Sequence, residues 1–122
     1  MKKILFLDDD PARWGIFSRL LIGTANTVVW AETSKDAIRH LSSNDFDVVL
    51  LDHDLGGRIF VESGPGTGYE VARWLEMHPD KIPEKVIIHS LNPDGAQNIN
   101  NVLPNAVQIP FLELVRDLHQ VL

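Results

Sequence analysis

The chain has no cysteine in its 122 residues and no long hydrophobic run. Without thiols it can form neither a disulfide framework nor a thiolate metal site, and we expect a reducing compartment. Its first residues, MKKILFL, resemble the start of a signal peptide, but three consecutive aspartates from Asp8 end the apolar run too early for one. No apolar stretch approaches the roughly eighteen residues of a membrane span. We therefore expect a cytoplasmic protein without membrane contact.

Positive charge is also scarce, since 11 basic residues face 17 acidic ones and the net charge is −6. Broad nucleic-acid binding needs a basic face, so we do not expect it. A small phosphate ligand is compatible with this charge, because Mg²⁺ or Mn²⁺ can lie between acidic side chains and a phosphate. The length fits one domain over residues 1–122, with 44% hydrophobic residues to fill its core.

Short apolar or β-branched runs alternate with stretches of helical periodicity along the chain. We expect strands at residues 3–7, 27–31, 48–51, 85–89 and 106–109. We expect helices at residues 11–21, 34–41, 67–78, 96–103 and 111–122, the first capped by Asp10 and the third ended by Pro79. Five β-then-α units in alternation predict an α/β fold with a doubly wound, five-stranded parallel sheet and helices on both faces.

The most informative stretch is VVLLDHDLGG, residues 48–57, in which a buried strand ends at Asp52, His53 and Asp54. Ligands of such sheets bind beyond the carboxyl ends of the strands, where Asp8 and Asp9 also follow the first strand. Asp8, Asp9, Asp52 and Asp54 could therefore converge on one Mg²⁺ or Mn²⁺ ion. If the chain stays extended past Asp52, Asp54 points the same way and His53 points oppositely.

A long loop follows this stretch. Residues 56–68 hold five glycines and a proline, which is too many for a regular element. Loops of this length in compact domains are commonly lids or binding segments. The GPGTG sequence in it lacks the spacing and the lysine of a P-loop, so we do not expect it to bind nucleoside triphosphates.

Several motifs in their order resemble the receiver domains of two-component response regulators. They are ILFLDDDP after the start, VVLLD, TGYEVARWL, Ser90 after the fourth strand and Pro110 after the fifth. The resemblance implies a CheY-like (βα)5 receiver fold of the flavodoxin-like kind. It also implies that Asp9, Asp52 and the backbone carbonyl of residue 54 hold Mg²⁺, and that Asp52 is the phosphoacceptor.

The chain departs from receivers at three places. Ile109 stands where receivers have an invariant lysine, so the cation that would contact the phosphoryl oxygens is missing. The loop after Asp52 is longer than in typical receivers and carries Arg58. Two histidines flank the expected site, His53 after the aspartate and His89 before the hydroxyl residue.

LDHDL together with HSLNPDGAQN is similar to a divergent group, the cyclic-phosphate processing receiver domains. That resemblance implies an enzyme acting on a small cyclic phosphate or on the cyclic-phosphate end of an RNA. Catalysis would then use Asp52 with its metal, and His53 and His89 as acid and base. Ser90 and Asn92 would orient phosphate oxygens, and Arg58 would replace the missing lysine as an oxygen clamp.

Other interpretations of these residues stay open at this point. His53 could be a solvent-facing loop residue, and His89 could be a hydrogen-bonded histidine of the core. Ser90 and Asn92 could serve only to form a turn before Pro93. The domain could also be a phosphorylation-responsive signalling module with a histidine kinase as partner, or a degenerate receiver that only binds a partner.

Overall fold

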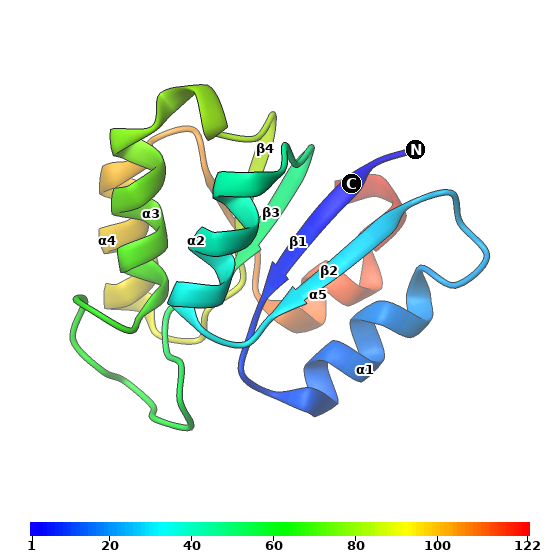
Figure 1. Ribbon diagram of the computed structural model, residues 1–122. Helices are drawn as coiled ribbons and strands as arrows, with labels where there is room; N and C mark the ends of the chain where they lie inside the picture. The colour runs from blue at the N-terminus through cyan, green and yellow to red at the C-terminus, as the bar shows by residue number, and fades with distance from the viewer.

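The computed structural model describes residues 1–122 and shows a parallel sheet between two layers of helices (Figure 1). The strands are β1 (Lys3–Leu7), β2 (Thr27–Ala31), β3 (Val48–Leu51), β4 (Lys85–Ile88) and β5 (Val107–Gln108), in the spatial order β2-β1-β3-β4-β5. The helices are α1 (Pro11–Leu20), α2 (Ser34–Ser43), α3 (Gly68–Met77), η1 (Pro79–Lys81), α4 (Pro93–Val102), α5 (Phe111–Arg116) and α6 (Leu118–Val121). The predicted doubly wound α/β fold is confirmed. No helix is long and apolar enough to cross a membrane.

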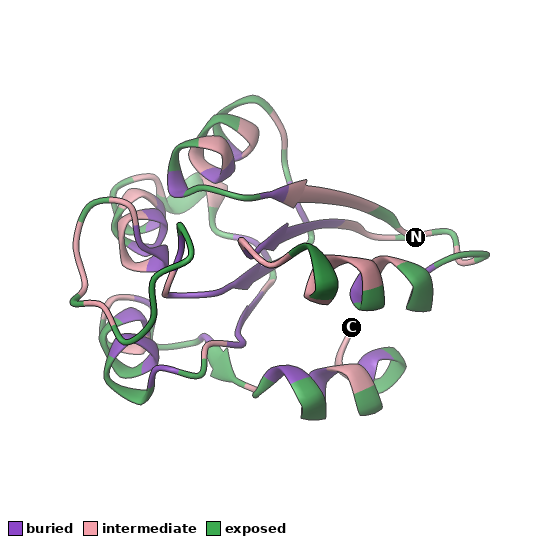
Figure 2. Cartoon of the chain, turned by 90° about the horizontal axis from the view of Figure 1, so that it is seen from below, coloured by how far each residue is buried: buried purple, intermediate pink, exposed green.

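The central strands bury both of their faces, which explains their continuous apolar sequences. Side chains alternate along β1 and β3, so Leu5 and Leu51 pack into one apolar cluster while Phe6 and Leu50 pack into the other. The first cluster lies under α2, α3 and α4, and the second under α1, α5 and α6. Figure 2 shows the buried positions gathered on these strands and on the helix faces turned toward them.

The register of the sheet decides which side chains meet beyond its carboxyl edge. Leu7 is level with Leu51, and Leu51 is level with Ile88, so Asp8, Asp52 and His89 follow at the same level of three neighbouring strands. Strand β1 is also the point at which the order of strands reverses. Crevices at such a reversal are the usual ligand sites of open α/β sheets.

Three elements differ most clearly from the prediction, while the other boundaries agree to within two residues. Helix α4 begins at Pro93 instead of residue 96, because the side chain of Asn92 caps it by accepting a hydrogen bond from the N–H of Gly95. Strand β5 has only two residues. The last helix, expected to be continuous, is interrupted at Asp117 between α5 and α6.

Candidate functional site

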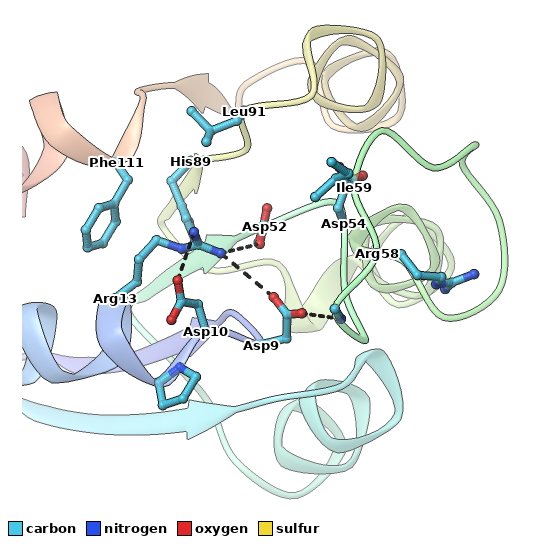
Figure 3. Close-up of a pocket in the computed structure, with 12 residues that line it drawn as sticks. Asp9, Asp10, Arg13, Asp52, Asp54, Arg58, Ile59, His89, Leu91 and Phe111 are labelled. Carbon is cyan, nitrogen blue, oxygen red and sulfur yellow. Dashed lines mark hydrogen bonds and ion pairs between the residues drawn. The ribbon is translucent and has the colours of Figure 1, made fainter.

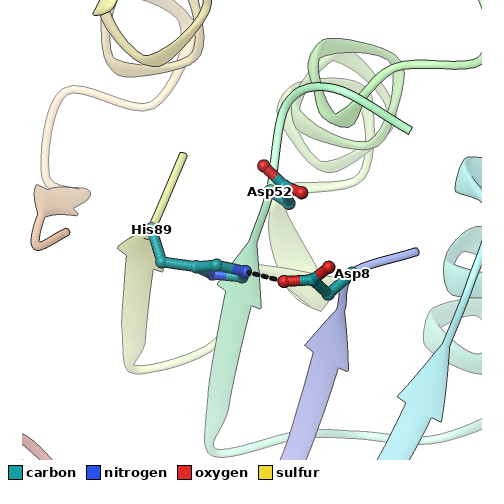
Figure 4. A group of neighbouring side chains, drawn as sticks. All are labelled: Asp8, Asp52 and His89. Atoms are coloured by element: carbon teal, nitrogen blue, oxygen red, sulfur yellow. Dashed lines mark hydrogen bonds and ion pairs between the residues drawn. The ribbon is translucent and has the colours of Figure 1, made fainter. Parts of the chain in front are cut away.

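Three buried side chains meet at the carboxyl ends of β1, β3 and β4, as Figure 4 shows. Asp8, Asp52 and His89 each offer one ligand atom, and these atoms lie within 4.8 Å of one another. The Nε2 atom of His89 is 3.1 Å from Asp8 Oδ2, which is hydrogen-bonding distance. The two aspartates expected to be neighbours are therefore brought together, and His89 joins them.

Arg13 of α1 lies in the middle of this acidic group, and the sequence did not identify it. Its Nε and Nη2 atoms donate hydrogen bonds of 2.7 and 2.9 Å to the two carboxylate oxygens of Asp8. Its Nη2 atom is also 3.6 Å from Asp52 Oδ2 and 3.8 Å from Asp9 Oδ1, and its Nη1 atom is 3.2 Å from Asp10 Oδ2. One guanidinium thus contacts four carboxylates.

The pKa values of the two buried aspartates are shifted in opposite directions. Burial tends to raise the pKa of Asp8, but hydrogen bonds from His89 and Arg13 outweigh it and leave the pKa below its ordinary value. Burial and the nearby charge of Asp8 raise the pKa of Asp52 to about 8, although Arg13 opposes the shift. Asp52 is therefore a carboxylate whose negative charge the fold itself stabilises poorly.

His89 combines two features that the sequence left as alternatives. It is a core histidine, 2% exposed, whose ring stacks on Phe6 with 5.0 Å between centroids. It also lines the cavity described below, and its buried Nδ1 atom has no hydrogen-bond partner. Burial lowers the pKa of His89 despite the opposing effect of Asp8, so the ring is neutral at neutral pH.

A cavity of about 410 Å³ opens over this group, and Figure 3 shows the side chains around it. Asp9 connects the end of β1 to the long loop at this cavity, because Asp9 Oδ2 accepts a hydrogen bond of 2.6 Å from the N–H of Gly57. The cavity is lined by Asp9, Asp10, Pro11, Arg13, Asp52, Asp54, Gly57, Arg58, Ile59, His89, Leu91 and Phe111. Acidic, cationic and apolar side chains therefore line the same cavity.

His53 follows Asp52 directly but does not line this cavity. Its Nδ1 atom is 2.7 Å from Asp54 Oδ1, and its Nε2 atom is 2.8 Å from the hydroxyl of Ser63. A Cβ atom at Gly95 would overlap the imidazole ring, so α4 can approach His53 only because this residue is glycine. His53 is fully buried, so it is not a solvent-facing loop residue. Nor does it line the cavity with His89, contrary to the expectation that both histidines flank one site.

His53, Asp54, Ser63 and Asn92 form one hydrogen-bonded group, which we name the loop latch. Asn92 donates through Nδ2 to Asp54 Oδ1 at 3.0 Å and to the carbonyl of Val61 at 3.1 Å. These bonds tie the long loop to the end of β3 and to the start of α4. Asn92, expected to orient phosphate, is thus engaged as a cap and as a loop anchor.

Asp54, expected to bind metal, also has its carboxylate engaged in the loop latch. Its Oδ2 atom accepts a hydrogen bond of 2.6 Å from the N–H of Phe60, a residue whose φ of 52° lies in the left-handed region. Burial tends to raise the pKa of Asp54, but hydrogen bonds from His53, Asn92 and Phe60 lower it below the ordinary value. Its side chain borders the cavity, but it is not part of the cluster of Asp8, Asp52 and His89.

Two further expected phosphate ligands lie at the edge of the site or outside it. Ser90 accepts a hydrogen bond of 3.0 Å from the N–H of Asn92, as in a turn, and does not line the cavity. Arg58 borders the cavity, but Figure 3 shows its guanidinium directed away from Asp52 and Arg13. One of its Nη atoms lies near Gly66, where a Cβ atom would be 3.6 Å away.

Two residues that contact the predicted site residues, Arg13 and Ser63, were not identified from the sequence. Arg13 could have been found, because it follows Asp9 by four residues and Asp10 by three on a helix, the spacing of side-chain ion pairs. Ser63 carried no local signal. Its contact with His53 spans ten residues of irregular loop, for which no periodicity predicts a partner.

The donor set suits a hard divalent cation. Asp8 and Asp52 of the cluster supply carboxylate oxygens, the ligand type that Mg²⁺ and Mn²⁺ prefer, and Asp9 adds another from the cavity lining, outside the cluster. A bound cation would also offset the burial and like charge that raise the pKa of Asp52. These residues therefore fit the metal that the sequence led us to expect.

The family described as "Cyclic-phosphate processing Receiver domain" matches residues 3–105. The chain belongs to this family. No curated protein matches the chain.

Solved receiver domains have the same fold as this member of the family. The response regulator TrrA from Thermotoga maritima, in complex with Mg(2+)-BeF, superposes with a TM-score of 0.72 at 22% identity over 100% of both chains. Chemotaxis protein CheY4 of Vibrio cholerae gives 0.73 at 19% identity over 100% of this chain and 99% of that one. The Mn(2+)-bound response regulator Rcp1 gives 0.74 at 16% identity over 99% and 91%. At these identities the likeness establishes the receiver fold.

Proposed function

We propose that this domain processes phosphoesters of the cyclic-phosphate class in the cavity at the carboxyl edge of its sheet. The observation that carries the proposal is the buried group of Asp8, Asp52 and His89, in which one histidine nitrogen contacts Asp8 and the other has no hydrogen-bond partner. Family membership supports the same substrate class. The proposed ligand is a small cyclic phosphate or a cyclic-phosphate RNA end, without broad nucleic-acid binding.

Asp8, Asp9 and Asp52 would hold Mg²⁺ or Mn²⁺ at this edge. The bound cation would neutralise the phosphate oxygens and make the phosphorus more electrophilic. The protein contributes the placement of these carboxylates. Asp8 is fixed by Arg13 and His89, and Asp9 by the N–H of Gly57.

His89 is the residue placed to move protons. Its Nε2–H donates to Asp8 Oδ2, which leaves the lone pair on Nδ1. In hydrolysis of a 2′,3′-cyclic phosphate, Nδ1 would take a proton from the attacking water as a P–O bond forms, which requires the ring to turn so that this buried atom faces the cavity. The same proton would then pass to the ring oxygen that leaves as a hydroxyl when its P–O bond breaks, so that one imidazole serves both transfers. In the structure, Phe6 and Asp8 contact the ring.

The apolar side chain of Ile109 favours an enzyme that acts on a phosphoester over a signalling receiver that keeps a phosphoryl group on Asp52. It packs against the apolar cluster under α1 and α5, so β5 offers no cation to a phosphorylated Asp52. The competing function is that of a phosphorylated signalling receiver, which the receiver fold and the position of Asp52 after β3 support.

Phosphorus NMR separates these functions. The protein is incubated with a 2′,3′-cyclic nucleotide, or with RNA bearing a cyclic end, plus Mg²⁺ or Mn²⁺. We expect a single phosphomonoester product that is lost in Asp52→Asn and retained in Asp45→Asn, whose side chain is 88% exposed. No product with either metal would overturn the proposal. A stable aspartyl phosphate formed from acetyl phosphate without any turnover would assign the chain to signalling.

A further inference from the structure

We infer that Arg13 is a built-in counter-ion of this site, which a divalent cation displaces from the carboxylates and whose freed guanidinium then holds phosphate oxygens. The second half of this inference rests on the proposed function. The first half rests on the geometry of the acidic group alone.

The guanidinium occupies the oxygens that a cation would need. Both oxygens of Asp8 accept hydrogen bonds from Arg13, at 2.7 and 2.9 Å. The same Nη2 atom is the one that approaches Asp52 at 3.6 Å and Asp9 at 3.8 Å. Two cations a few ångströms apart in a poorly solvated site repel each other strongly. Arg13 and a divalent ion therefore compete for the carboxylates of Asp8, Asp9 and Asp52.

The exchange requires only a side-chain movement. Arg13 is the third residue of α1, and its side chain is 29% exposed and borders the cavity. Asp10 lies at the cavity edge and already accepts an ion pair of 3.2 Å from Nη1. The guanidinium can thus leave Asp8 and stay paired with Asp10, without any change in the helix.

The released group would lie where a phosphate clamp is missing. Ile109 supplies no cation, and the guanidinium of Arg58 is directed away from Asp52 (Figure 3). Arg13 is the other arginine that lines the cavity, and its planar fork suits two phosphate oxygens. One divalent ion and one guanidinium together carry three positive charges against the four carboxylates that Arg13 contacts, which reduces the negative charge that a phosphate anion would meet.

Metal affinity tests the exchange without any substrate. Mn²⁺ binding is measured by calorimetry and by electron paramagnetic resonance on the wild type, Arg13→Gln and Arg19→Gln. Arg19 is on the same helix, is exposed and contacts Gly15, so it controls for net charge. We expect Arg13→Gln to bind Mn²⁺ at least about tenfold more tightly, a typical coupling between competing sites. Equal or weaker binding than in Arg19→Gln would overturn the exchange.

The wild type provides a second measurement if Arg13→Gln does not fold. The Arg13 Nε–Hε resonance should be slow to exchange in metal-free protein, because it bonds to buried Asp8. Addition of diamagnetic Mg²⁺ should shift this resonance and leave that of Arg19 in place. No shift at saturating Mg²⁺ would overturn the displacement.

Inorganic phosphate tests the clamp on Mn²⁺-loaded protein. We expect Arg13→Gln to bind phosphate about tenfold more weakly than Arg19→Gln, although it binds the metal more tightly. Unchanged phosphate binding would overturn the clamp. Failure of the proposed function is a separate result, because it would appear as missing turnover of cyclic phosphate with a normal response of metal affinity to Arg13→Gln.

Discussion

The cavity and the loop latch adjoin at Asp54, beyond the end of the same strand, and they use the same kinds of residue differently. Each contains aspartate and a buried histidine. In the cavity, His89 keeps one nitrogen without a partner and Asp52 makes only one direct hydrogen bond, from the N–H of His53. In the latch, both nitrogens of His53 and both oxygens of Asp54 have partners.

The comparison shows that residue type alone does not tell a reactive side chain from a structural one, because both regions contain aspartate and a buried histidine. Asp52 and His53 are neighbours in sequence, but Asp52 lines the cavity, whereas the ring of His53 packs against Gly95 of α4. Satisfied polar groups stabilise the fold, whereas unsatisfied buried groups cost free energy and are commonly kept for function. The cavity therefore holds the groups available for chemistry, and the latch holds the loop that forms part of its wall.

The largest effect on stability should come from the buried charge of Asp52. Its pKa of about 8 in the fold exceeds its ordinary value of 3.8. Between pH 3.8 and about 8, Asp52 is therefore protonated more often in the folded than in the unfolded state. Protonated Asp52 contributes fully to the free energy of unfolding below about pH 4, and this contribution is lost as the pH rises through 8. Asn cannot ionise, so Asp52→Asn removes the loss of stability that ionisation of Asp52 causes. We expect this variant to be more stable than the wild type by about 1–4 kcal/mol at pH 8 in the absence of metal.

Urea unfolding with a chelator present measures this at several pH values. The advantage of Asp52→Asn should shrink as the pH falls toward 4, while Asp45→Asn should show no such trend. An advantage that stays constant with pH would show that burial of the charge is not its cause.

A pair of glycine substitutions compares the latch with a neutral position. Gly95→Ala should destabilise the protein by about 1–3 kcal/mol, because the new Cβ overlaps His53 and forces the latch apart. Gly15→Ala places its Cβ 3.4 Å from the flexible end of Arg19 and should stabilise by up to about 1 kcal/mol through helix propensity. Thermal unfolding of both variants gives the signs, and equal signs would argue against a tightly packed latch.

The smallest effect should come from Arg58. Its guanidinium faces away from the carboxylates and makes one long hydrogen bond of 3.5 Å, to Leu55. We expect Arg58→Ala to change stability by less than about 0.5 kcal/mol, as at most exposed positions. We also expect phosphate affinity to change less than in Arg13→Gln. A larger loss of phosphate affinity in Arg58→Ala would restore Arg58 as the oxygen clamp.

The sequence predicted the strands and the placement of the acidic residues because these depend on local patterns. The all-apolar run Val48–Leu51 has few alternatives to a buried parallel strand, and the Asp10–Pro11 pair defines a helix start. The strand ends of a parallel sheet then bring Asp8 and Asp52 together. Asp52 lines the cavity and His53 does not, but Asp54 bonds to His53 instead of joining the cluster of Asp52, because β3 ends at Leu51 and the chain does not continue as a strand.

The partners of these residues depended on irregular structure, and there the sequence was insufficient. Nothing local connects His53 with Ser63, or shows that Gly95 leaves room for an imidazole ring. Asn92 and Pro93 are typical of a turn and equally of a helix start, and the packing of α4 on the latch decides between them. Arg13 was overlooked because a basic residue in an acidic stretch is usually a surface ion pair.

The two histidines allow the most direct test of the account. Turnover of a 2′,3′-cyclic nucleotide with Mg²⁺ is measured for His89→Gln and His53→Gln, at a temperature where circular dichroism shows both variants folded. We predict that His89→Gln loses about 10² to 10⁴ in kcat, as expected for removal of a general acid–base. We predict that His53→Gln stays within about tenfold of the wild type and is mainly less stable. Equal losses, or a larger loss in His53→Gln, would contradict the assignment of chemistry to the cavity and of structure to the latch.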